Sequence, residues 1–114
     1  MAHIKWTNEM RKLAFTTIRN KYGACTKDNY KDYSKKLYQD EVLLNKLTSA
    51  LNTLFEVNIS EKGLQMQLKW AFTIQNHVKE EYVRSFFLNK AVALEVGIID
   101  NSLLPKELLF DYNK

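Results

Sequence analysis

Residues 60–69 contain the side chains whose types and spacing best suit a defined chemistry, which is contact with nucleic-acid bases. If the leucines of this segment face a core, then Lys62, Gln65 and Lys69 form one outward stripe at spacings of three and four residues. Glutamine can pair bidentately with adenine, and lysine can reach guanine or a phosphate. The stripe therefore predicts base readout by an exposed helix. The alternative is an ordinary amphipathic helix whose Lys and Gln side chains are solvated.

A second set of basic residues predicts contacts with phosphates. Residues 1–39 hold nine Lys/Arg against three Asp/Glu, a net charge of +6, whereas residues 40–114 hold eight against ten, or −2. This asymmetry favours a polyanionic partner, and its alternative explanation is a solvated face that keeps the protein in solution. The candidates are Ser60, at the start of a helix, and the basic residues Lys5, Lys12, Arg19, Lys27, Lys31 and Lys35.

Catalytic and metal-binding chemistry is not predicted. The chain has two histidines, His3 and His77, and one cysteine, Cys25, and none of them falls in a zinc-site or metalloprotease spacing. No glycine-rich phosphate loop or GxSxG motif is present. We therefore expect no enzyme, no catalytic residue, no metal and no cofactor. A small enzyme that uses Cys25 or His77 is the least favoured alternative.

Helices are the elements predicted to position these residues. Three Gly and one Pro in 114 residues are few for a β-rich fold, and apolar residues recur at helical spacing. We predict one all-α domain of five or six helices over residues 1–114, with a helix-turn-helix-like element. Within it, residues 4–75 would form a DNA-binding core, and residues 77–114 would form C-terminal helices that pack or dimerise.

Capping residues and apolar stripes predict where the helices lie. Around Asp40 a second helix either continues or gives way to a new helix with Asp40 as its cap. The other predicted boundaries are an N-cap at Thr7 or Asn8, a C-cap at Gly23, an N-cap at Ser60, a C-cap at Gly97 and a short last helix after Leu104. The predicted inner stripes of the later helices are Leu44, Leu47, Leu51, Leu54 and Phe55, then Leu64, Leu68, Ala71, Phe72 and Gln75, then Val83, Phe87, Lys90, Ala91 and Leu94.

The start of the chain resembles the opening helix of Myb/SANT-like DNA-binding modules. Trp6-Thr7-Asn8-Glu9 is followed by Leu13, Ile18 and Tyr22-Gly23, and residues 59–68 are similar to the third, DNA-reading helix of those modules. The resemblance covers roughly residues 4–75. It departs from the family in lacking the middle tryptophan and in a longer spacing between Trp6 and Ser60. Such modules occur beside nuclease domains in phage homing endonucleases, and phage and phage-satellite genomes carry stand-alone versions that resemble repressors.

The resemblance implies a sequence-specific protein that binds double-stranded DNA. It would be a transcriptional repressor of phage or mobile-element origin that occupies a promoter without cleavage, in the cytoplasm of a bacterial host. No apolar run approaches the roughly 18–20 residues of a membrane span, so no membrane is expected. A homodimer is expected because two half-sites multiply a modest affinity, with the Phe-rich residues 82–94 as interface. The alternative is a small phage protein-binding inhibitor or adaptor that blocks a host or phage protein through an aromatic patch on residues 83–94.

Overall fold

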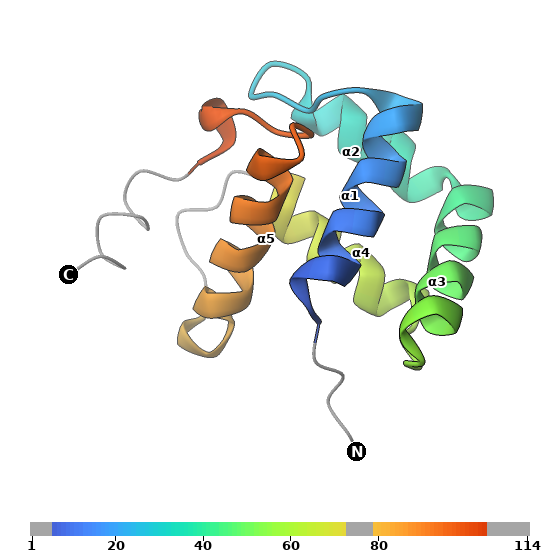
Figure 1. The fold of residues 1–114 in the computed structure, drawn as a ribbon. Coiled ribbons are helices and arrows are strands. Elements are labelled where there is room, and N and C mark those ends of the chain that lie inside the picture. Colours follow the sequence, from blue (N-terminus) through green and yellow to red (C-terminus); the bar gives the residue numbers. More distant parts are fainter. Residues whose placement is uncertain (1–5, 73–78, 105–114) are drawn as a thin grey trace.

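The structure is a computed structural model that describes residues 6–72 and 79–104, and these residues form an all-helical fold (Figure 1). This confirms the predicted fold class, and no strand occurs in the two described ranges. The predicted last helix and Gln75 lie outside the described residues. None of the described helices is both long and apolar enough to cross a membrane. The elements are α1 (Asn8–Tyr22), α2 (Tyr30–Gln39), α3 (Glu41–Phe55), α4 (Glu61–Phe72), the 3-10 turn η1 (Glu80–Tyr82), α5 (Val83–Glu95) and the 3-10 turn η2 (Asn101–Leu103).

The helix boundaries follow local capping chemistry, as predicted. The Thr7 hydroxyl accepts a hydrogen bond from the Met10 amide at 3.2 Å, and the Ser60 hydroxyl accepts one from the Gly63 amide at 3.0 Å. Gly23 ends α1 with a positive φ of 78°, which a residue without a Cβ adopts at little cost. Gly97 follows α5 with a φ of 79°.

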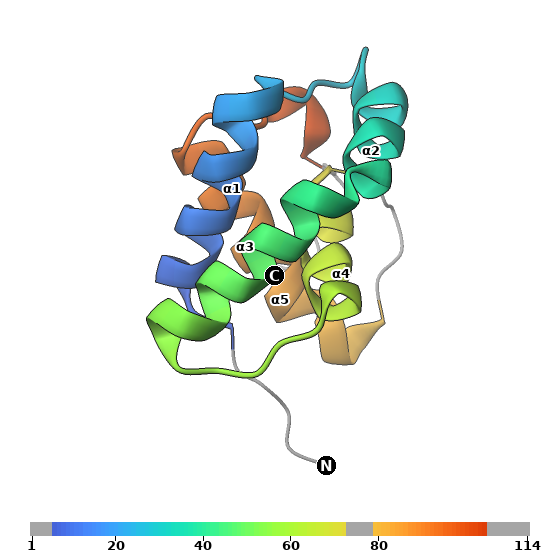
Figure 2. The same cartoon turned by 90° about the vertical axis from the view of Figure 1, so that its right-hand side faces the viewer.

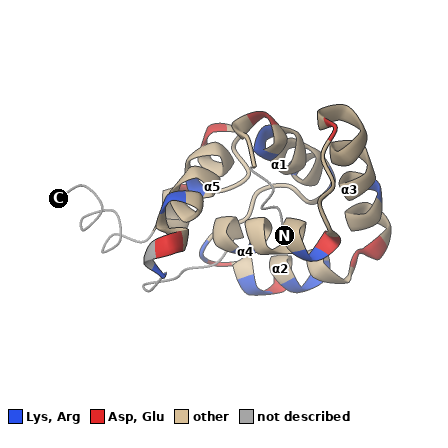
Figure 3. Ribbon diagram, turned by 90° about the horizontal axis from the view of Figure 1, so that it is seen from below, with Lys and Arg blue, Asp and Glu red and all other residues tan. Residues whose placement is uncertain are grey.

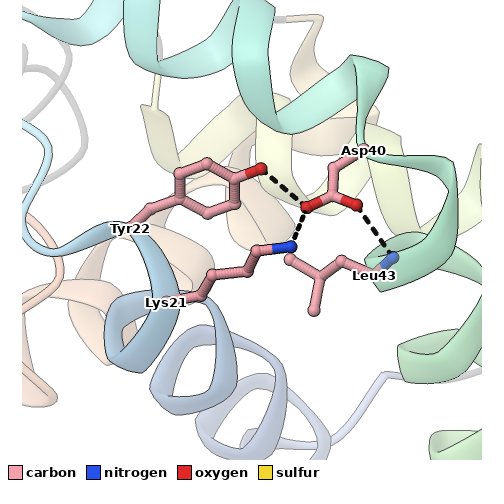
Figure 4. Close-up of polar contacts among 4 residues, drawn as sticks. All are labelled: Lys21, Tyr22, Asp40 and Leu43. Atoms are coloured by element: carbon pink, nitrogen blue, oxygen red, sulfur yellow. Dashed lines mark hydrogen bonds and ion pairs between the residues drawn. The ribbon is translucent and has the colours of Figure 1, made fainter.

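Asp40 separates α2 from α3, so of the two alternatives at this point the structure has the new helix. One carboxylate oxygen of Asp40 accepts the Leu43 amide at 3.0 Å and caps α3. The other accepts Lys21 Nζ at 2.5 Å and the Tyr22 hydroxyl at 2.6 Å (Figure 4). Hydrogen bonds from Lys21, Tyr22 and the Leu43 amide, in that order of effect, lower the pKa of Asp40 to about 2. This carboxylate therefore joins the end of α1 to the start of α3.

The variant Asp40→Asn tests this link between α1 and α3, because it keeps a side-chain cap and removes the charge. A carboxyl group with a lowered folded-state pKa stabilises the fold above its ordinary pKa, near 3.8, and loses that contribution as the pH falls toward about 2. We expect the urea midpoint of the wild type to exceed that of Asp40→Asn near neutral pH, and the gap to close between about pH 4 and pH 2. The matched control is Asp32→Asn, because the Asp32–Lys36 pair at 3.1 Å is exposed and should give a small gap at every pH. If the difference in urea midpoint between the wild type and Asp40→Asn is the same at every pH, the ion pair does not stabilise the fold.

The core forms where α4 packs against α2, α3 and α5, while α1 packs against α3 and α5. In Figure 1, α1 and α4 lie between α5 on one side and α3 on the other, and Figure 2 shows α1 on the side away from α2 and α4. Phe72, at the end of α4, has its ring 6.1 Å from that of Phe15 in α1 and 5.3 Å from that of Tyr33 in α2. Ile98, Ile99 and other buried residues after α5 join the same core, and the Cys25 amide donates to the Ile98 carbonyl at 2.7 Å.

The predicted inner stripe of α3 is wrong at its end. Leu44, Leu47 and Leu51 are buried, but Leu54 is 66% exposed. The buried face passes from Leu51 to the half-buried Phe55 at a spacing of four, which leaves Leu54 outside it. α3 ends at Phe55, and its C-cap Glu56 takes a left-handed conformation with a φ of 53°.

The predicted stripe of α5 is also wrong, because Ala91 and Leu94 are exposed. The buried residues of α5 are Phe86, Asn89, Lys90, Val92 and Ala93. The spacing of Phe86, Asn89 and Ala93 is that of one helix face, so polar side chains occupy core positions there. Polar residues in such positions must find partners on a neighbouring helix, and those partners are not visible in the local apolar pattern.

Candidate nucleic-acid interface

The outer side of α4 carries the predicted base-reading residues. Lys62 and Lys69 are exposed and Gln65 is half-buried, whereas Leu64 and Leu68 are fully buried on the opposite side. α4 therefore has one apolar side in the core and one polar side in solvent, as its spacing requires.

Lys62, Gln65 and Lys69 all line one hollow beside the outer side of α4. Its volume is about 270 Å³, and Tyr38, near the end of α2, lines it on the side opposite α4. Its lining residues are Tyr38, Lys62, Gln65, Met66 and Lys69. A wider groove of about 750 Å³ shares Tyr38, Lys62 and Gln65 with this hollow and extends to the first turns of α3. The outer side of α4 is thus an indented surface bordered by α2 and α3.

The exposed lysines of α2 extend this surface. Lys31, Lys35 and Tyr38 are spaced four and three residues apart, so they share one side of α2. Tyr38 lines the hollow beside α4. Lys31 and Lys35 are exposed on the same side of α2, toward the start of that helix. Figure 3 shows basic positions along α2, which lies with α4 on the side of the molecule away from α1. Two of the predicted phosphate contacts therefore lie on the helix that packs against α4.

The other predicted phosphate contacts are not brought to this surface as a group. Lys12 pairs with Glu95 of α5 at 3.3 Å, and Arg19 Nη1 donates to the Val96 carbonyl at 2.5 Å, so both lie where α1 meets the end of α5. Lys27 is exposed in the loop before α2, and its amide donates to the Ser102 hydroxyl at 3.0 Å. The Ser60 hydroxyl is exposed but serves as the cap of α4. Lys5 lies outside the described residues.

Three polar contacts hold α4 in position, and the apolar pattern of the sequence does not predict them. At its start, the Asn52 side chain accepts from the Ile59 amide at 2.7 Å and donates to the Ile59 carbonyl at 3.1 Å. The side chain of Asn89 in α5 donates to Gln67 Oε1 at 2.6 Å. Near the end of α4, Lys90 Nζ donates to the Ala71 carbonyl at 2.8 Å, where a cation also complements the helix dipole. A surface on a helix held at both ends and in the middle is well suited to binding without rearrangement.

Lys90 of α5 is the buried residue that holds the end of α4. It is 1% exposed, and burial lowers its pKa to about 8 from an ordinary value near 10.5. Its ammonium group lies 5.6 Å from the centre of the Phe86 ring. The position of Lys90 within an apolar stripe was the one sequence signal for a buried cation.

Comparison of the chain with protein-family models, with curated proteins and with solved structures gives no match.

Cys25, one of the groups considered for catalysis, is placed unfavourably for a nucleophile. Cys25 is fully buried, and burial raises the pKa of its thiol to about 12, whereas a reactive cysteine needs an accessible thiolate. His3 and His77 lie outside the described residues. Within residues 6–72 and 79–104, no three His, Cys, Asp or Glu side chains group together as a metal site would require.

The aromatic patch expected on residues 83–94 is reduced by the packing of α5. Phe86 is fully buried, and its ring contacts that of the half-buried Phe87 at 5.4 Å. The large apolar side chains exposed near this helix are Tyr82, at 39%, and Leu94, at 37%. The ring of Tyr82 lies 5.4 Å from that of the buried Trp70. Tyr82 and Leu94 are therefore the large apolar side chains most exposed on this surface.

Proposed function

We propose that this protein binds duplex DNA sequence-specifically, with the outer side of α4 in the major groove, and that it represses transcription by occupying its site. The observation that carries the proposal is the alignment of Lys62, Gln65 and Lys69 on the exposed side of α4, beside the lysines of α2. The major groove is about 12 Å wide and admits an α-helix. A lysine ammonium group can donate to O6 and N7 of guanine, and the amide of Gln can donate to N7 of adenine and accept from its N6 amino group.

The neighbouring helices suit the proposed binding mode. α3 packs against α4, and residues 56–60 connect the two, so this pair would act as the helix-turn-helix-like element. Lys31 and Lys35 would contact phosphates beside the groove that α4 enters, which sets register and orientation rather than sequence. Lys12 and Arg19 have no such role in the proposal, because they bind groups of the α5 end of the molecule.

A homodimer is part of the proposal, because paired half-sites raise affinity without any new contact within each half. Repression then follows from occupancy, since a bound dimer excludes other proteins from the same DNA. Sedimentation of the free protein and of its complex with a palindromic duplex gives the stoichiometry directly.

Salt dependence tests the DNA contact itself. With about three to four phosphates neutralised by one subunit, the affinity of that subunit for a duplex selected from a random pool should fall roughly 40- to 150-fold between about 50 and 200 mM salt. The double variant Lys31→Ala/Lys35→Ala should lower the slope of log affinity against log salt by about 2 for each bound subunit, whatever the sequence of the duplex. Fluorescence anisotropy with labelled duplexes measures both quantities.

The matched control for this experiment is Lys12→Ala/Arg84→Ala, which removes the same charge from exposed positions on α1 and α5. Its slope should equal that of the wild type. If no duplex from the pool is retained even at about 50 mM salt, the proposed function is wrong.

A further inference from the structure

The exposed side of α4 includes one apolar side chain that the core does not use. Met66 is 50% exposed, although methionine is ordinarily a core residue. It lines the 270 Å³ hollow together with Lys62, Gln65 and Lys69, and it follows Lys62 by four residues and precedes Lys69 by three. The proposed reading surface therefore has an apolar contact at its centre, between two ammonium groups.

The spacing of this surface matches a short run of base pairs. Lys62 and Lys69 are separated by seven residues, which at about 1.5 Å per residue is about 10.5 Å along the helix. Base pairs of duplex DNA rise about 3.4 Å each, so the two lysines span about three base-pair steps. Gln65 and Met66 lie midway along α4 between the two lysines, so they would face the central pairs of that run. The chemistry of the central pairs must then match an amide and an exposed thioether side chain.

We infer that Met66 contacts the 5-methyl group of a thymine, and that the site read by α4 has an A·T pair at its centre with G·C pairs on either side. This inference rests on the proposed function. The thymine methyl is the apolar group that base pairs present in the major groove, and adenine presents the donor–acceptor pair that the amide of Gln65 can match. Guanine O6 and N7 accept from lysine, so Lys62 and Lys69 account for the flanking pairs. Tyr38 borders the hollow on the side of α2, so the methyl contact would lie next to an aromatic ring.

Deoxyuridine in place of thymine tests the inference, because it removes the methyl group and leaves the base pairing unchanged. The duplex selected from a random pool is prepared with each thymine replaced in turn, and binding is measured by fluorescence anisotropy. Wild-type protein should bind about fourfold more weakly when one central thymine is replaced, the effect of one buried methyl group. Met66→Ala should bind the thymine and deoxyuridine duplexes equally.

Val42→Ala is the matched control. Val42 is 65% exposed and lines the adjoining groove, but it belongs to α3. It should keep the fourfold preference for thymine. A preference that persists in Met66→Ala, or a bound duplex with no thymine at which deoxyuridine weakens binding, overturns the role of Met66 and leaves the proposed function standing. Failure to bind any duplex overturns both.

Discussion

Replacing Phe72 with alanine is expected to lower the free energy of unfolding by about 3–5 kcal/mol, the largest single-residue effect on stability that we predict. Phe72 has no exposed surface, and its ring contacts those of Phe15 and Tyr33. These three rings join α1, α2 and α4, so alanine leaves a cavity bordered by three helices that cannot all close on it. Urea unfolding, followed by the helical circular dichroism signal, gives the change in the free energy of unfolding.

The control for Phe72→Ala is Leu54→Ala. Both residues lie at helix ends in inner stripes predicted from the sequence, yet Leu54 is 66% exposed. Leu54→Ala should change the free energy of unfolding by no more than about 0.5 kcal/mol. A comparable loss in both variants would contradict the assignment of Phe72 to the core and of Leu54 to the surface.

The contrast between these residues shows which features of the fold the sequence could predict. Helix ends depend on local contacts, so Thr7, Gly23 and Ser60 could be recognised as caps from their neighbours alone. At Asp40 the sequence left two alternatives, because a helix break there depends on side chains nineteen and eighteen residues away, Lys21 and Tyr22. The sequence therefore predicted helix ends that depend on neighbouring residues better than a helix end that also contacts a distant helix.

Helix faces were harder to predict than helix ends. In α5 the core side contains Asn89 and Lys90, whose partners are Gln67 and the Ala71 carbonyl on α4. An apolar periodicity cannot place a buried polar residue, because burial there depends on a hydrogen bond to a distant part of the chain. The stripe predicted for α5 was displaced for this reason.

The candidate site divides in the same way. Lys62, Gln65 and Lys69 belong to one helix, so their common side followed from spacing. The charge of +6 over residues 1–39 could not show which basic residues share a surface. The structure places Lys31 and Lys35 on α2, which packs against α4, and it pairs Lys12 of α1 with Glu95 of α5. Net charge per segment predicts a partner's sign but not the face that meets it.

Removing the three polar side chains of α4 is expected to have the largest effect on binding. The triple variant Lys62→Ala/Gln65→Ala/Lys69→Ala should lose specific affinity by at least roughly a hundredfold, because each good base contact contributes about 1–3 kcal/mol of discrimination. Binding to unrelated duplexes should fall much less, since Lys31 and Lys35 remain. Alanine favours helices, so α4 should keep its helicity. Competition between the selected duplex and a shuffled duplex measures the specific part of the affinity.

A matched triple variant separates loss of base contacts from loss of charge. Lys12→Ala/Asn20→Ala/Arg84→Ala also removes two positive charges and one amide, from exposed positions on α1 and α5. If the charge of the whole molecule controlled binding, both triple variants would weaken the selected and the shuffled duplex alike. If the outer side of α4 reads bases, only the α4 variant abolishes the difference between the two duplexes. Equal specificity in the α4 variant and the wild type would remove α4 as the reading helix, even if the protein still bound DNA.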